Sequence, residues 1–204
     1  MIQIQKKSDA AVIVLHEIYG VNQHIKDFCD FLTDQHYDVI CPDLIKRDFA
    51  FDYSQEETAY RHFMEKIGFS EASKLVKGII SNVKDEYDKI FIIGFSIGAT
   101  IAWLCSEEEG ISGIVGYYGS RIRNYVGITP KCPTILFFPQ EEQSCNVDDV
   151  ISALGDKEEV GIHKYKGRHG FSDPYSAAYN AASSQIALNE TMLFLKKHRI
   201  TSIS

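Results

Sequence analysis

Residues 88–105 read DKIFIIGFSIGATIAWLC, and this stretch decides the fold. Residues 89–95 form a continuous apolar run rich in isoleucine and phenylalanine, which predicts a strand buried on both faces. Residues 99–105 are typical of a helix that follows directly. The join is GFSIG at 94–98, a G-x-S-x-G pattern. Between a strand and a helix, this pattern predicts a sharp turn that exposes the hydroxyl of Ser96 as a nucleophile.

Strand-like and helix-like segments alternate along the rest of the chain. Further strands are predicted at 11–17, 37–43, 111–119, 134–139 and 163–167, and further helices at 22–35, 70–84 and 176–198. This alternation predicts an α/β protein whose mostly parallel central sheet has helices on both faces. Because no repeat, low-complexity tract or linker divides the sequence, we expect residues 1–204 to form one domain.

Composition excludes several classes of protein. A hydrophobic fraction of 45% with 24% charged residues is that of an ordinary globular protein, not of a disordered or collagen-like chain. The 21 Lys+Arg against 28 Asp+Glu give a net charge of −7, which opposes binding to nucleic acid or to an anionic membrane. Five cysteines without a C-x-x-C pattern favour reduced thiols over disulfides or a zinc site. With no signal-peptide pattern at the start, we expect a cytoplasmic protein.

A serine nucleophile needs a general base and an acid that orients it, and in folds of this type they follow in the order serine, acid, histidine. Three histidines follow the serine, namely His163, His169 and His198. His163 falls within a predicted strand, and His198 falls in the last turn of the final helix, where we expect it at the surface. His169 lies in a glycine-flanked loop after a strand and is therefore the predicted base.

The acid should follow the predicted strand 134–139. The carboxylates available there are Glu141, Glu142, Asp148 and Asp149. The two aspartates are typical of the first turn of a helix, where the helix dipole favours negative charge. Glu142 is the predicted acid because a turn after the strand can direct it toward the base, and Glu141 remains its alternative.

The predicted strand 11–17 ends in HEIYG at 16–20. The backbone N–H of Ile18 and that of Ile97 at the start of the next helix are predicted to bind the oxyanion. Glu17 enters the same region from an apolar strand, so its charge needs a partner or its pKa is raised. It either supports the reacting groups or binds loop N–H groups as a structural carboxylate.

Substrate contacts are predicted from residues near the strand ends. Tyr60 and Tyr118 are candidates to line the pocket, with packing as the alternative role. Arg121 and Arg123 follow closely and are candidates to bind an acidic substrate group, or are solvated. The polar segment 46–57 and the loop 120–130 are both candidates for a lid.

Several motifs together extend over nearly the whole chain. They are HEIYGVN at 16–22, CPDL at 41–44, DKIFIIGFSIGA at 88–99, GYYG at 116–119 and YKGRHGF at 165–171. In these motifs the sequence resembles the dienelactone hydrolase family of the α/β-hydrolase superfamily. The resemblance implies an α/β-hydrolase fold. It also implies that Ser96 matches the nucleophile, Glu142 the acid and His169 the base. The oxyanion donors match Ile97 and Ile18, and the supporting carboxylate matches Glu17.

The sequence departs from the family pattern at three places. Ser96 stands where dienelactone hydrolases have a nucleophilic cysteine, so here the base must remove the proton during attack. The usual G-x-x-D acid turn is PQEE at 139–142, which makes the acid a glutamate. Two arginines that hold the carboxylate of dienelactone in the family match Glu56 and Asp173, so an anionic lactone would meet like charge.

These inferences predict a serine hydrolase that cleaves a small carboxylic ester, lactone or thioester through an acyl-enzyme. The chemistry requires no metal and no organic cofactor. Two alternatives remain: a non-catalytic small-molecule-binding module that keeps the fold, and an acyltransferase. The oligomeric state, monomer or homodimer, is left open by the sequence.

Overall fold

The centre of the molecule is a seven-stranded sheet. The computed structural model describes residues 1–155 and 157–200, and within them the strand order is β1-β3-β2-β4-β5-β6-β7. The strands are β1 (Ile2–Ile4), β2 (Ala10–Leu15), β3 (Asp38–Cys41), β4 (Lys89–Phe95), β5 (Gly113–Tyr117), β6 (Thr134–Glu141) and β7 (Val160–Arg168). All neighbouring strands pair in parallel except β1, which pairs antiparallel with β3 at the edge. The predicted α/β class with a mostly parallel sheet is therefore confirmed.

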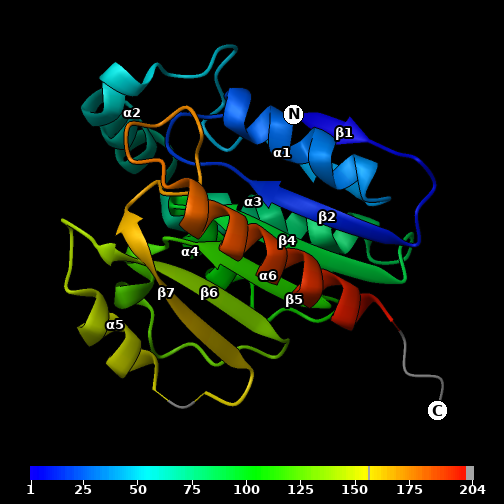
Figure 1. Ribbon diagram of the computed structural model, residues 1–204. Coiled ribbons are helices and arrows are strands. Elements are labelled where there is room, and N and C mark those ends of the chain that lie inside the picture. The colour runs from blue at the N-terminus through cyan, green and yellow to red at the C-terminus, as the bar shows by residue number, and fades with distance from the viewer. Residues whose placement is uncertain (156, 201–204) are drawn as a thin grey trace.

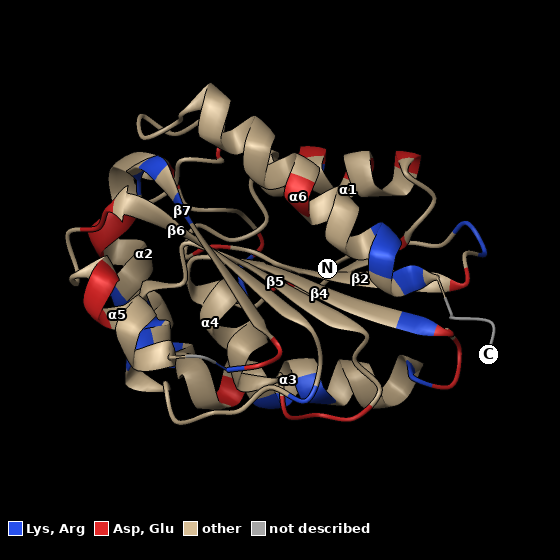
Figure 2. Ribbon diagram, turned by 60° about the horizontal axis from the view of Figure 1, so that its bottom comes forward, with Lys and Arg blue, Asp and Glu red and all other residues tan. Residues whose placement is uncertain are grey.

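Helices cover both faces of this sheet. They are α1 (Gln23–Asp34), α2 (Glu56–His62), α3 (Gly68–Val83), α4 (Ile97–Leu104), α5 (Val147–Leu154) and α6 (Ala181–Arg199), with short helical turns η1 (Tyr53–Gln55), η2 (Phe63–Ile67) and η3 (Ser120–Asn124). Figure 1 shows α1 and α6 side by side on one face and α3 with α4 on the other. The turned view in Figure 2 separates the same two layers, with the sheet between them. None of the helices in the described residues is both long enough and apolar enough to cross a membrane.

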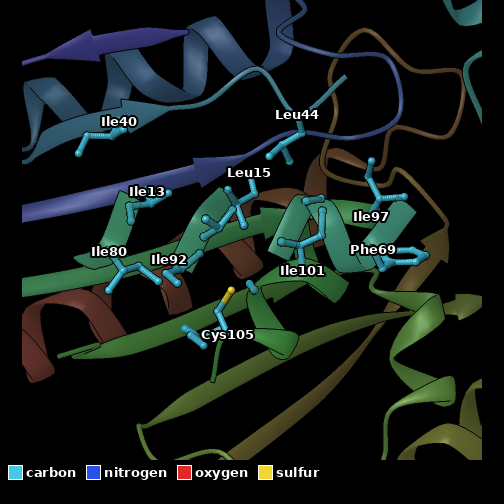
Figure 3. Close-up of a cluster of buried hydrophobic side chains, with 14 of the residues drawn as sticks. Ile13, Leu15, Ile40, Leu44, Phe69, Ile80, Ile92, Ile97, Ile101 and Cys105 are labelled. Carbon is cyan, nitrogen blue, oxygen red and sulfur yellow. The ribbon is translucent and has the colours of Figure 1, made fainter. Parts of the chain in front are cut away.

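Alternate side chains of the central strands fill two apolar layers. On the α3–α4 face, Ile13 and Ile92 pack with the buried side of these helices, as Figure 3 shows. On the opposite face, Val12 and Phe91 pack against α1 and α6. Both sides of these strands are thus buried, which explains why their sequences are continuously apolar and do not alternate.

Several boundaries differ from the sequence-based expectation. Helix α6 begins at Ala181 and not at 176, because the side chain of Asn180 accepts a hydrogen bond from the Ser183 N–H and caps the helix there. Strand β1 and helix α2 were not predicted. The three residues of β1 are too few for a periodic signal, and α2 presents only Ala59 to the core.

The parallel arrangement positions the site. Strands β2, β4, β6 and β7 run in one direction, so the residues that follow them meet at the same edge of the sheet. Glu17 follows β2, Ser96 follows β4, Glu142 follows β6 and His169 follows β7. Four residues widely separated in the sequence are thereby brought to one place.

Candidate active site

Ser96 occupies a strained turn between β4 and α4. Its backbone has φ 53° and ψ −111°, a conformation that non-glycine residues seldom adopt. The two glycines of the motif make the turn possible. A Cβ at Gly94 would lie 2.2 Å from the Gly98 carbonyl oxygen, and one at Gly98 would lie 2.2 Å from the Leu15 carbonyl oxygen. The turn therefore holds the serine at the carboxyl end of β4.

His169 is hydrogen-bonded to Ser96. Its Nε2 lies 2.8 Å from the Ser96 Oγ. The imidazole directly follows β7, and the φ of 85° at Gly170 belongs to the left-handed region that favours glycine. The ring of Tyr118 lies 5.0 Å from the imidazole ring, centre to centre, and supports it from within the molecule.

Glu142 contacts the other nitrogen of the same imidazole. Its Oε2 lies 2.6 Å from the His169 Nδ1, and its side chain is only 6% exposed. Its Oε1 accepts a hydrogen bond of 3.2 Å from the Ser144 N–H. Glu141, the alternative acid, is exposed and makes no contact with His169 in the described residues. The pairing of β6 with β7 changes register between Pro139 and Glu141, which turns the chain just before Glu142.

The charges of this pair stabilise each other. Burial alone would raise the pKa of Glu142, but the hydrogen bond and positive charge of His169, with the Ser144 N–H, lower it below its usual value. Burial alone would lower the pKa of His169, but the hydrogen bond and negative charge of Glu142 raise it. The contact therefore favours an imidazolium beside Ser96 once a proton has been accepted.

Glu17 is a buried carboxyl beside these groups. Burial raises its pKa to about 7, although the nearby His169 and the Tyr118 hydroxyl act in the opposite direction. Its Oε1 has no hydrogen-bond partner within the described residues. Buried side-chain oxygens nearly always have a hydrogen-bond partner, so this unpaired oxygen is unusual. Glu17 is therefore free to interact with a group in the cleft that it lines together with Ser96.

The loop that carries Glu17 and Ile18 is fixed by a buried histidine that the sequence analysis did not select. His16 Nδ1 lies 2.6 Å from the Glu17 carbonyl oxygen, and its Nε2 accepts a hydrogen bond of 2.9 Å from the Leu44 N–H. Burial lowers the pKa of His16 to about 4, so the ring is neutral and Nδ1 is the donor. No local signal distinguishes this histidine, because Leu44 joins it only through the fold.

Ile18 and Ile97 both line the cleft next to Ser96. Among the described residues, neither backbone N–H donates a hydrogen bond to a protein acceptor. Ile97 is the first residue of α4, where backbone N–H groups have no partner in the helix and the helix dipole is positive. The Ile97 N–H thus follows Ser96 directly in the chain, and that of Ile18 belongs to a residue that lines the same cleft.

The site opens into a cleft of about 810 Å³. Tyr60 from α2 and Arg121 from η3 both line it, and the Arg121 guanidinium donates a hydrogen bond to the Tyr60 hydroxyl. Parts of both predicted lid segments also reach it, since Glu56 belongs to the first and Ser120 begins the second. Arg123 instead donates to the Ser120 carbonyl oxygen at 2.6 Å.

Two sequence-based placements need correction. Tyr118 is fully buried and does not line the cleft; its hydroxyl lies 3.0 Å from the Ser172 Oγ. It therefore packs behind His169 and is not placed to contact substrate. His198 is not simply at the surface, because it is half-buried and its ring packs against Phe194 at 4.6 Å.

The positions that match the family arginines differ from each other. Glu56 lines the cleft and is exposed. Asp173 is fully buried outside the cleft, and its Oδ2 accepts a hydrogen bond of 2.5 Å from the Tyr53 hydroxyl. Only Glu56 is therefore placed to meet a substrate directly.

Comparison with known proteins assigns the chain to a family. The model of the dienelactone hydrolase family matches residues 1–199. The chain belongs to the dienelactone hydrolase family. Among relatives, the uncharacterized protein YczH of Bacillus subtilis is 39% identical over 173 residues, which cover 84% of this chain and 85% of that protein. The carboxymethylenebutenolidase of Pseudomonas putida is 24% identical over 205 residues, covering 93% and 86% of the two chains.

Solved structures show the same fold. A Klebsiella pneumoniae protein provisionally described as a dienelactone hydrolase superposes with a TM-score of 0.78 at 22% identity, covering 95% of this chain and 90% of that one. The dienelactone hydrolase-like promiscuous phosphotriesterase P91, from metagenomic libraries, gives a TM-score of 0.69 at 16% identity, covering 96% and 88%. Members of the dienelactone hydrolase family with this α/β-hydrolase fold are hydrolases, which makes this chain a hydrolase by family.

Proposed function

We propose that this dienelactone hydrolase family member cleaves a small carboxylic ester, lactone or thioester through an acyl-enzyme on Ser96. The single observation that carries the proposal is the unbroken hydrogen-bond chain from Ser96 through His169 to Glu142, with contacts of 2.8 Å and 2.6 Å. A nucleophile, a base and an orienting acid in this relation are what acyl transfer requires.

In the proposed first step, the Ser96 Oγ forms a bond to the substrate carbonyl carbon and its proton passes to the His169 Nε2. The Nδ1–H donates to Glu142, which leaves Nε2 unprotonated and able to accept that proton. The tetrahedral intermediate then loses its alcohol or thiol, which takes the proton from the imidazolium. Water next attacks the acyl carbon and gives its proton to His169; the bond from that carbon to the Ser96 Oγ then breaks, Oγ takes the proton back from the imidazolium, and the carboxylic acid leaves.

The negative oxygen of the tetrahedral intermediate needs donors that are already oriented. The N–H groups of Ile18 and Ile97 support this role, since neither donates to a protein acceptor in the described residues and both residues line the cleft that contains Ser96. A permanent negative charge on Glu17 would oppose the intermediate. Its pKa of about 7 means that it is partly protonated near neutral pH, so we propose that it supports the reaction by limiting this repulsion.

The charges in the cleft favour an uncharged substrate. Glu56 and Glu141 line the cleft as exposed carboxylates, together with two guanidinium groups that already donate to protein acceptors, Arg121 to the Tyr60 hydroxyl and Arg168 to the Ala177 carbonyl oxygen. A substrate carboxylate that approaches Glu56 or Glu141 would meet like charge. Neutral esters, lactones and thioesters are therefore the proposed substrates, in place of an anionic dienelactone.

The direct test is covalent labelling. A fluorophosphonate probe should add its mass to the peptide that contains Ser96, and 4-nitrophenyl acetate should be hydrolysed. Ser96→Ala should lose labelling and lower kcat by at least about 10³-fold while the melting curve stays unchanged. Undiminished turnover in Ser96→Ala would refute the proposal.

Acyl transfer is the second candidate because the cleft of about 810 Å³ exceeds what a short ester needs and leaves room for an acyl acceptor. Adding alcohols or amines to the reaction would separate the two, since a transferase forms the new ester or amide in preference to the acid. A non-catalytic binding module would be favoured by a Glu142 that lies away from His169, and the contact of 2.6 Å between them instead supports the hydrolase.

A further inference from the structure

A second cavity, which is partly open to solvent, lies apart from the catalytic cleft. It has a volume of about 230 Å³ and shares no lining residue with the catalytic cleft. Helices α1 and α6, which lie side by side in Figure 1, form two of its walls. Its lining is mainly aromatic, with Phe28, Phe31, Phe95, Tyr117, Tyr179 and the aliphatic Leu188. Since an apolar protein cavity of about 150 Å³ holds benzene, this one has room for a substituted ring.

One buried polar group in this lining has no hydrogen-bond partner. His24, in the first turn of α1, has a side chain only 5% exposed; its Nδ1 is fully buried without a hydrogen-bond partner, and its Nε2, which is less deeply buried, makes no hydrogen bond to the protein within the described residues. Burial lowers the pKa of its imidazole, so the ring is neutral near pH 7. The imidazole belongs to the lining of the pocket and its Nε2 has no protein partner, so a ligand seated there can pair with it.

The surroundings of His24 determine which nitrogen is available. Its Nδ1 lies 3.7 Å from the Oδ2 of Asp173, and that carboxylate already accepts the Tyr53 hydroxyl. A carboxylate attracts an N–H and repels a lone pair, so the proton belongs on Nδ1. Nε2 is then the free acceptor, and a partner for it must supply a donor such as a hydroxyl.

We propose that this cavity binds a small aromatic alcohol, with its ring against Phe28 and Phe95 and its hydroxyl donated to Nε2 of His24. The rings of both phenylalanines already pack around this position, with Phe95 at 4.9 Å from the His24 ring and 5.0 Å from Phe28. The charged groups on this side, Asp27 in the lining and Asp173 behind the imidazole, are both acidic. They disfavour aromatic acids, whereas a neutral phenol is not repelled.

The ligand would act on the catalytic residues through one buried contact. Ser172 lines the cavity, its Oγ lies 3.0 Å from the Tyr118 hydroxyl, and the Tyr118 ring packs against His169. A molecule in the cavity therefore changes the support of the catalytic imidazole, which makes the ligand an effector. This part of the inference rests on the proposed hydrolase function, whereas the binding part does not.

Calorimetry with p-cresol tests the binding, and toluene, which has the same shape without the hydroxyl, is the matched ligand. The wild-type protein should bind p-cresol at least about tenfold more tightly than toluene. Leu188→Trp should fill the cavity and abolish binding, whereas Leu193→Trp, on the same helix but 62% exposed, should bind as the wild type does. His24→Phe should bind both ligands equally. Ser184→Leu fills the same cavity and serves if Leu188→Trp does not fold.

Unchanged p-cresol binding in a folded cavity-filling variant would overturn the proposal, as would equal affinity of the wild type for the two ligands. For the effector part, saturating p-cresol should change kcat/KM for 4-nitrophenyl acetate at least about twofold in the wild type and not in the cavity-filling variant. An unchanged rate with calorimetrically bound p-cresol would overturn the coupling alone. Absence of any ester hydrolysis would instead refute the proposed function and leave the binding result standing.

Discussion

Nε2 of His169 lies 2.8 Å from the Oγ of Ser96, although 73 residues separate them in the sequence. The contact joins the end of β7 to the turn after β4, two strands that are not neighbours in the sheet. The turn after β4 supplies only the serine. The acid and the base follow β6 and β7, so the site is complete only when these two strands have joined the sheet. The proposed chemistry depends on that assembly.

Replacing the proposed acid should slow catalysis without unfolding the protein. Glu142→Gln keeps the side-chain shape but removes the charge that stabilises the imidazolium, so kcat should fall by about 10³-fold. Glu141→Gln is the matched control, since it alters the neighbouring exposed carboxyl, and it should retain most of the wild-type rate. A larger loss in the control would show that Glu141 is the acid.

The pH profile should report the pairing of His169 with Glu142. The base works when neutral, so kcat/KM rises as pH increases through the pKa of His169, which Glu142 holds above its usual value. Glu142→Gln removes the hydrogen bond and charge that raise this pKa, so the rising limb should move to lower pH. Steady-state rates between pH 5 and 9 measure the shift; a limb displaced to higher pH would contradict the assignment.

Glu17 should make stability depend on pH. Its pKa is raised to about 7 in the folded state, so the folded protein binds more protons than the unfolded one between pH 5 and 7, and stability falls as pH rises. Above pH 7 the buried charge costs about 3 kcal/mol at most. Urea titrations should therefore show that the free energy of unfolding of Glu17→Gln, relative to that of the wild type, increases from pH 5 to pH 8. A difference independent of pH would indicate that this carboxyl does not titrate in that range.

The turn at Ser96 should not tolerate an added methyl group at the following glycine. Gly98→Ala would bring a Cβ to 2.2 Å from the Leu15 carbonyl oxygen, a backbone atom that cannot move without shifting β2. We expect a loss of about 2–3 kcal/mol in the free energy of unfolding. Gly127→Ala is the control, because nothing lies within 4 Å of its added Cβ. Chemical denaturation of the two variants gives the comparison, and equal stabilities would contradict the steric argument.

Glu56 should act against anionic substrates. Glu56→Gln removes an exposed carboxylate from the cleft, so kcat/KM for an ester that carries a carboxylate, such as 4-nitrophenyl hydrogen succinate, should rise about threefold relative to 4-nitrophenyl acetate. Glu57 lies next to Glu56 on α2 and does not line the cleft. In Glu57→Gln, the ratio of kcat/KM for the anionic ester to kcat/KM for the neutral ester should therefore equal that of the wild type. The same increase in both variants would indicate a long-range effect of net charge.

Much of the fold could be predicted from local patterns. One example is the segment that contains β4, the glycines of the turn and the start of α4, which are consecutive in the chain. Their structure depends on adjacent residues, so a local sequence pattern predicts it. His169 was predicted by chain order and glycine flanks, and Glu142 by its position after β6. Their roles in catalysis stay predictions, while their mutual contacts are features of the structure.

Other features were decided only by tertiary structure. The choice between Glu141 and Glu142 depends on which way each side chain points after a change of register, and the burial of Tyr118 depends on packing against residues far along the chain. The free imidazole of His24 and the aromatic cavity around it arise where α1 meets α6. The sequence by itself determined the order of elements and the residue types at the strand ends, because these depend on adjacent residues. Contacts between distant residues depend on strand register and helix packing, and therefore only the folded chain determines them.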